Sequence, residues 1–127
     1  MYGVAITDQS QEGFLEIDLI DILCLLGSLV KNSEWELSGV ECAGGNAADD
    51  LHRLSDSSAR VPGRSLLRLA ADVTQIIDGL FKGYRNGENH PWIVVRAVDS
   101  SAYDVESEDK EVLARVRKYF RNVTDLP

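Results

Sequence analysis

Residues 80–106 read LFKGYRNGENHPWIVVRAVDSSAYDVE, and this stretch decides the fold. Two turn signals divide it, Asn86-Gly87 and Asp99-Ser100-Ser101. Asn-Gly between apolar runs is a strong hairpin signal, and Asp and Ser favour turns through hydrogen bonds to nearby backbone groups. The sequence therefore predicts three consecutive strands joined by turns, at Leu80–Arg85, Trp92–Val98 and Tyr103–Glu106.

The middle run, Trp92–Val98, is apolar on both of its faces. Strands buried on both faces read as continuous apolar runs, so this run predicts a central strand that is covered on both sides. Should the face of Trp92, Val94 and Val98 lack a covering helix, it would form an exposed apolar patch, which usually marks a binding surface.

The clearest helix is predicted from about Ser65 to Asp78, and Gly79 follows where a left-handed residue commonly ends a helix. A second helix is predicted from Ser107 to about Phe120, because its acidic first turns and basic last turn match the helix dipole. The apolar stripe of the first helix recurs at steps of three and four residues and comprises Leu66, Leu69, Ala70, Val73 and Ile77.

Shorter elements are predicted in the first half of the chain. Leu15–Leu19 alternates apolar and polar residues, which predicts a strand, with Val4–Ile6 as another. Asp18 is also a candidate N-cap for a helix that is apolar on nearly every side. Trp35–Cys42 alternates again, with a change of phase at Gly39 that indicates a β-bulge.

With a further short helix at Ala47–Leu54, these elements predict a single α+β domain over residues 1–127. We expect a mostly antiparallel sheet of four to five strands packed with three to four helices. A doubly wound parallel sheet is less favoured, because the strands do not alternate with long helices. A chain of 127 residues with 44% hydrophobic residues is large enough to bury a core without disulfides.

Cysteine usage and the N-terminus bear on the compartment. Cys24 and Cys42 do not make a disulfide framework in a chain of this size, so two buried free thiols in a reducing compartment are expected. The N-terminus lacks the basic start and apolar run of a signal peptide. The most apolar stretch, residues 17–30, is short and contains two aspartates, which argues against a membrane span. A cytoplasmic protein is expected.

The net charge of −8 is unevenly distributed along the chain. Residues 1–50 contain ten acidic residues and one basic residue, whereas residues 51–127 contain eleven acidic and twelve basic residues. Nucleic-acid-binding proteins carry a basic footprint instead, so no nucleic-acid partner is expected. The acidic half is either a solubilising surface or a face that receives a basic partner.

No motif for catalysis, a cofactor or a metal is complete. Ala43–Asn46 precedes a helix but lacks the lysine and the hydroxyl residue of a P-loop. Asp49, Asp50 and His52, even with a cysteine, do not have metal-ligand spacing. The serines of the 99–101 turn lack the glycine-flanked elbow of a serine nucleophile. We therefore assign no catalytic, cofactor-binding or metal-binding residue and expect no cofactor.

One basic series has three open interpretations. Arg60, Arg64 and Arg68 step by four residues, although Pro62-Gly63 interrupts a helix after the first of them. The three arginines contact the acidic half of the chain, bind an anion, or are simply solvated.

Three functional hypotheses follow from these observations. The first is a small acidic protein-interaction module, such as an inhibitor or immunity-type protein that masks a basic partner. The second is a small-molecule-binding protein or a hydrolase-type enzyme with a pocket near the 99–104 turn, and the third is a structural homodimer. For the first, the candidate partner-binding residues are Glu34, Glu36, Glu41, Asp49, Asp50 and Trp92.

Overall fold

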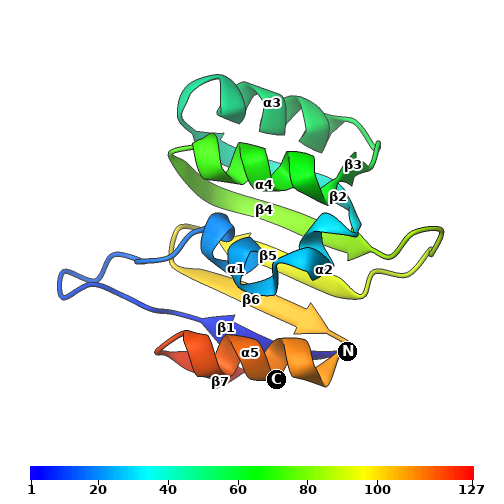
Figure 1. The fold of residues 1–127 in the computed structure, drawn as a ribbon. Coiled ribbons are helices and arrows are strands. Elements are labelled where there is room, and N and C mark those ends of the chain that lie inside the picture. The colour runs from blue at the N-terminus through cyan, green and yellow to red at the C-terminus, as the bar shows by residue number, and fades with distance from the viewer.

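Seven strands form one sheet in the order β3-β2-β4-β5-β6-β1-β7, and every neighbouring pair is antiparallel. Figure 1 shows this arrangement in a computed structural model, which describes residues 1–127. The strands are β1 (Tyr2–Ile6), β2 (Glu34–Ala43), β3 (Val61–Pro62), β4 (Gln75–Tyr84), β5 (Ile93–Val98), β6 (Ala102–Ser107) and β7 (Val123–Asp125). The helices are α1 (Leu19–Leu26), α2 (Ser28–Lys31), α3 (Gly45–Asp56), α4 (Gly63–Asp72) and α5 (Lys110–Tyr119).

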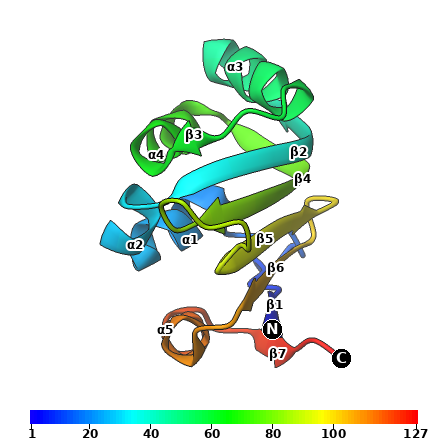
Figure 2. The same cartoon turned by 90° about the vertical axis from the view of Figure 1, so that its right-hand side faces the viewer.

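The helices cover one face of the sheet and leave the other bare. Helices α1, α2, α4 and α5 lie on the same side of the sheet, and α3 lies beside β2 at the end of the sheet (Figure 2). The covered face carries the core, in which 29 buried side chains form one cluster. This arrangement confirms the predicted α+β class and a single domain. One core row, of residues opposite one another on five strands, is Leu37, Phe81, Val95, Val105 and Val4.

The protein has more strands and more helices than the sequence predicts. β3 has two residues and β7 has three, which is too short for a period-two pattern to show. Both are strands only because they pair with a neighbour, β3 with the start of β2 and β7 with β1. The additional helix arises because Gly27, at φ 51°, separates α1 from α2.

The meander predicted from residues 80–106 is confirmed, since β4, β5 and β6 follow one another in the sheet. The turn from β5 to β6 is tight: the Ser101 N–H donates to the Val98 carbonyl at 2.8 Å. The coverage predicted for β5 is wrong, because helices lie on one side only. On the bare side Arg96 is exposed, and Val94 and Val98 are half-buried.

The helix predicted over residues 65–78 is wrong in its second half. α4 ends at Asp72, and β4 begins at Gln75. Two contacts with distant residues fix this boundary. The Thr74 N–H donates to the Ala43 carbonyl at 3.0 Å, and the Ile76 N–H donates to the Asp18 carboxylate at 3.2 Å. Strand pairing thus overrides the helical spacing of the apolar residues.

The residues at the end of that predicted helix take other positions. Val73 is buried as expected, whereas Leu69 is half-buried and Ile77 is a half-buried residue of β4. Gly79 does not end a helix but lies opposite Ala97 within the sheet. A Cβ at Gly79 would lie 3.0 Å from the Phe81 ring, so a small residue fits this position.

The strand predicted at Leu15–Leu19 is also wrong. This segment is the returning arm of a loop and forms a single bridge between Gln9 and Leu15, and Leu19 already begins α1. Its alternation has a different cause, because Leu15 and Ile17 pack against the core while Glu16 is exposed.

Asp18 is the N-cap of α1, as predicted, and it also joins α1 to two strands. Its carboxylate accepts the Leu19 N–H at 2.8 Å, the Tyr103 hydroxyl at 2.5 Å and the Ile76 N–H at 3.2 Å. Asp21 completes a capping box by accepting the Asp18 N–H. Asp18 therefore holds α1, β4 and β6 together.

The two remaining predicted helices are both present, with ends that differ from the prediction. The C-terminal helix is confirmed as α5, but it begins at Lys110 with Asp109 as N-cap, because Ser107 is still part of β6. The helix predicted at Ala47–Leu54 extends from Gly45 to Asp56 as α3. From α3, the Ser55 hydroxyl accepts the Val40 N–H of β2 at 2.9 Å, which satisfies a donor on an edge that β3 leaves unpaired.

Both cysteines are free thiols, but they are not both buried as predicted. Cys24 is exposed on α1, and Cys42 is half-buried on β2. None of the five helices has the length and the apolar composition needed to cross a bilayer.

Candidate functional site

The bare side of the sheet, which we call the open face, is built from alternate residues of its strands. Its side chains are half-buried or exposed and mix charged with aliphatic groups. One row across the strands is Glu36, Lys82, Val94 and Glu106. The next row is Ser38, Leu80, Arg96, Asp104 and Ala5.

Acidic groups outnumber basic groups on the open face. At one end Glu34 lies opposite Tyr84, and the Arg60 guanidinium stacks on the Tyr84 ring at 3.8 Å from its centre. At the other end Glu41 lies opposite Asp78. Taken together, the acidic residues are Glu34, Glu36, Glu41, Asp78, Asp104 and Glu106, and the basic residues are Arg60, Lys82 and Arg96.

None of these charged groups lies within ion-pair distance of another, although Lys82 stands opposite Glu36 and Arg96 stands opposite Asp104. None of the nine side chains takes part in the ion pairs of the protein, which all lie elsewhere. Burial raises the pKa of Asp104; the charge of Arg96 opposes this rise, and that of Glu106 adds to it. Glu41 and Asp78 are like charges directly opposite each other, an arrangement that destabilises a sheet.

A shallow hollow of about 340 Å³ lies within the open face. It forms where Gly39, at a φ of 60°, presents no side chain, and Arg96 and Asp78 contribute its charged groups. The Asp78 carboxylate is held in place by the Asp99 N–H, which donates to it at 2.8 Å. The hollow can therefore receive a polar side chain, and an exposed guanidinium and a fixed carboxylate line it.

The predicted partner-binding residues fall into three groups. Glu34, Glu36 and Glu41 all belong to β2, but Glu36 and Glu41 lie opposite Lys82 and Asp78, which are four residues apart on β4 and so about 13 Å apart at a strand rise of about 3.3 Å per residue. Asp49 and Asp50 lie on α3, beside the sheet, and Asp50 forms an ion pair with Arg53. The five carboxylates thus do not form one compact cluster.

The prediction places Trp92 on the partner-binding surface, but the residue is buried in the structure. Its side chain is 1% exposed, and its indole N–H donates to the Ser33 hydroxyl at 2.8 Å. It therefore offers no surface to a partner. The predicted apolar patch is reduced to Val94 and Val98, because Trp92 precedes β5 and turns into the core.

Sequence reasoning did not assign six charged residues of the open face to the partner-binding surface: Arg60, Asp78, Lys82, Arg96, Asp104 and Glu106. The signal was present in the period-two alternation of Tyr103-Asp104-Val105-Glu106, in which the apolar residues are buried and the acidic ones are half-exposed. The alternation was hidden in β5, because Val94 and Val98 face the bare side but are apolar like the residues of the core.

The arginine series does not form a stripe. Arg60 stacks on Tyr84 and donates to the Glu88 carbonyl at 3.1 Å. Arg64 is exposed near the start of α4, and Arg68 lines a cleft between α3 and α4 together with Arg53. The three guanidinium groups thus face different surroundings.

One cysteine and one histidine lie close together where α3 meets β2. The Cys42 Sγ atom is 3.7 Å from the His52 Nε2 atom. Burial raises the pKa of the Cys42 thiol, and the charges of Asp18 and Asp49 raise it further. This environment disfavours the thiolate that a nucleophilic cysteine requires. No three His, Cys, Asp or Glu side chains come together in a way that could hold a metal ion.

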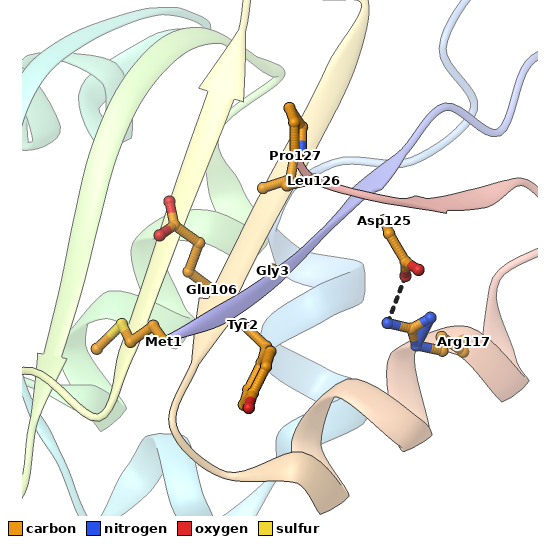
Figure 3. A pocket seen from close by; sticks show the side chains of 8 residues that line it. All are labelled: Met1, Tyr2, Gly3, Glu106, Arg117, Asp125, Leu126 and Pro127. Carbon is orange, nitrogen blue, oxygen red and sulfur yellow. Dashed lines mark ion pairs between the residues drawn. The ribbon is translucent and has the colours of Figure 1, made fainter.

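A pocket of about 560 Å³ lies at the rim of the sheet, between β1, α5 and the segment after β7 (Figure 3). Arg117 projects toward it but forms an ion pair with Asp125 at 2.6 Å. Glu106 is the other charged side chain of the wall. No histidine, cysteine or serine lines the pocket, so it lacks the histidine-activated serine or cysteine of a hydrolase.

A second hollow, of about 330 Å³, lies beside the turn of residues 99–101. Ser100 is on its wall, and its hydroxyl accepts a hydrogen bond from the Gln75 amide at 3.2 Å. Neither His52 nor His90 lines it. The serine therefore has no imidazole base at this position.

Comparison of the chain with family models, with curated proteins and with solved structures finds no match.

Proposed function

We propose that this protein is a small interaction module that binds a basic protein partner through the open face of its sheet. The observation that carries the proposal is an uncovered sheet face on which six acidic groups stand with three basic groups, none of them in an ion pair. Such a surface attracts a cationic partner and speeds its encounter. An inhibitor or immunity-type protein that masks a basic surface fits this description.

The charge of the open face favours a different partner over a second copy. In a two-fold dimer the same patch meets itself, so each copy would bring its excess of carboxylates against that of the other. Juxtaposed like charges cost several kcal/mol at an interface. A partner rich in lysine and arginine removes this repulsion.

The alternative of a small-molecule-binding protein or hydrolase rests on the hollow beside Ser100. This alternative has less support, because that hollow contains Asp18 already engaged by three donors and a serine without a histidine base.

The test is an NMR titration of the isotope-labelled protein with an arginine- and lysine-rich peptide as the probe. We expect the largest shifts at amides of β4, β5 and β6 and at the open-face residues of β2. The double variant Glu36→Lys with Asp104→Lys should weaken binding at least several-fold, because both changes reverse charge within the face.

The matched control is Asp56→Lys with Asp72→Lys, which alters net charge by the same amount at two exposed positions that lie at the ends of α3 and α4, away from the open face. This control should retain most of the binding. Equal weakening by both double variants would show that only net charge matters, and shifts confined to the helices would place the contact elsewhere; either result rejects the proposal.

A further inference from the structure

The loop between β1 and α1 presents a single aromatic side chain to solvent. Phe14 is 72% exposed, more than any other large hydrophobic residue of the chain. Figure 1 shows this segment, in blue, projecting past the body of the sheet. The residues after it, Leu15 and Ile17, pack against the core, so the exposure is confined to the tip.

The tip is closed by its own hydrogen bonds. The Ser10 N–H donates to the Phe14 carbonyl at 2.8 Å, and the Phe14 N–H donates to the Ser10 hydroxyl at 3.2 Å. Within this ring the Gly13 N–H donates to the Ser10 carbonyl at 3.0 Å, and Gly13 has a φ of 85°. A backbone closed in this way presents Phe14 in a defined direction.

The base of the loop is fixed to the body of the protein. The buried Asp8 carboxylate accepts the backbone N–H of Asn122 at 2.7 Å and that of Arg121 at 3.0 Å. The Arg121 guanidinium donates to the Glu16 carboxylate at 3.1 Å, and the Glu16 N–H donates to the Asp8 carbonyl at 2.9 Å. Both arms of the loop are thus tied to the segment that follows α5.

We infer that this loop is a preorganised recognition arm, and that Phe14 is its anchor for an apolar pocket on a protein partner. Aromatic side chains that fill a partner pocket carry much of the energy of protein interfaces. A loop that is ordered before binding loses little conformational entropy when it docks. Phe14 contributes nothing to the core, and the hydrogen bonds of the tip hold it in solvent, where a partner can reach it.

The charges beside Phe14 define the mouth of the partner pocket. Glu12 is exposed and forms no ion pair in this chain, while Glu16 is already paired with Arg121. The partner should therefore carry a lysine or arginine beside an apolar concavity. The same acidic flank argues against insertion into an anionic lipid surface. The arm is a contact separate from the open face and does not depend on it.

The test replaces Phe14 with the photo-cross-linker p-benzoylphenylalanine in the full chain, expressed in its native cells and irradiated. Tyr2 and Tyr119, each 64% exposed, are the matched positions for the same cross-linker. We expect a discrete adduct from position 14, at several-fold higher yield than from positions 2 and 119. The cross-linked peptide of the partner should come from an apolar segment with a lysine or arginine close by.

Two further variants separate anchoring from chance contact. Glu12→Lys, made together with the cross-linker, should lower the yield of the adduct several-fold, and Phe14→Ser should leave the melting temperature unchanged. An adduct yield at position 14 no higher than at position 119 would overturn the inference. So would an adduct only to a second copy of the chain, or a large loss of thermal stability in Phe14→Ser, which would assign Phe14 to the fold.

Discussion

The turn between β5 and β6 places two residues with side chains in a conformation that favours glycine. Asp99 has a φ of 46° and Ser100 a φ of 56°, as the two central residues of a type I′ turn require. Ser100→Gly should raise the free energy of unfolding by about 0.5–1 kcal/mol, because glycine adopts this conformation without steric cost. Chemical denaturation measures the change.

The neighbouring serine provides the control for this turn. Ser101 does not have a positive φ, and its hydroxyl donates to the Val98 carbonyl at 2.9 Å. Ser101→Gly should therefore lower stability. A loss of stability in both variants would contradict the strain assigned to Ser100.

The hydrogen bond between Tyr103 and Asp18 predicts a loss of stability at alkaline pH. Burial raises the pKa of Tyr103 far above its ordinary value of about 10, and the charge of Asp18 raises it further. Because the folded pKa lies above the unfolded pKa, the stabilisation is fully present below about pH 10 and is lost as the pH rises above that value. The melting temperature should therefore fall more steeply above about pH 10 than below it.

Two phenylalanine variants assign this alkaline loss. Tyr103→Phe should be less stable at neutral pH, since Asp18 loses a donor, and its stability should depend less on pH above about pH 10. Tyr119→Phe, at an exposed position, should behave as the unchanged protein. Thermal melts at several pH values give the comparison, and identical profiles for both variants would contradict the role of Tyr103.

At the level of elements, the phase of α4 decides which leucines support the core. Leu66 is fully buried, whereas Leu67 is half-buried. Leu66→Ala should cost about 2–5 kcal/mol, as a cavity in a packed core does, and Leu67→Ala clearly less. Denaturant melts of the two variants measure the difference, and equal losses would contradict the orientation of the helix.

The elements that sequence predicts well are those whose ends are marked by local chemistry. The Asp18 cap, the Asn86-Gly87 loop and the turn at residues 99–101 all form where local hydrogen bonding favours them. The end of α4 could not be predicted, because a stripe at helical spacing continued into residues that instead pair with β2. β3 and β7 could not be predicted from the sequence either, because a strand of two or three residues forms only when it pairs with a neighbouring strand.

At the level of the whole molecule, linear charge counting located only part of the candidate site. It identified Glu34, Glu36 and Glu41 because they lie in the acidic first half. It missed Asp104 and Glu106, which lie in the nearly neutral second half and reach the same surface through the order of the strands. Which side of the sheet stays bare depends on where the helices pack, and neither composition nor periodicity contains that information.

The open face should reduce the stability of the protein in proportion to its unpaired acidic charge. Glu41 stands opposite Asp78, and neither forms an ion pair; burial raises the pKa of Asp104, so the fold disfavours its ionised form relative to the unfolded chain. Glu41→Lys replaces a repulsive cross-strand pair by an attractive one and should raise the free energy of unfolding by about 0.2–1 kcal/mol. The gain should shrink in high salt, where exposed charges are screened. Glu12→Lys makes the same change of net charge away from the sheet and should give little or no gain.

If the open face binds a basic partner, Glu41→Lys should also weaken binding of the arginine- and lysine-rich peptide, so that stability and binding change in opposite directions. A gain in stability with unchanged peptide binding would mean that these carboxylates serve solubility alone.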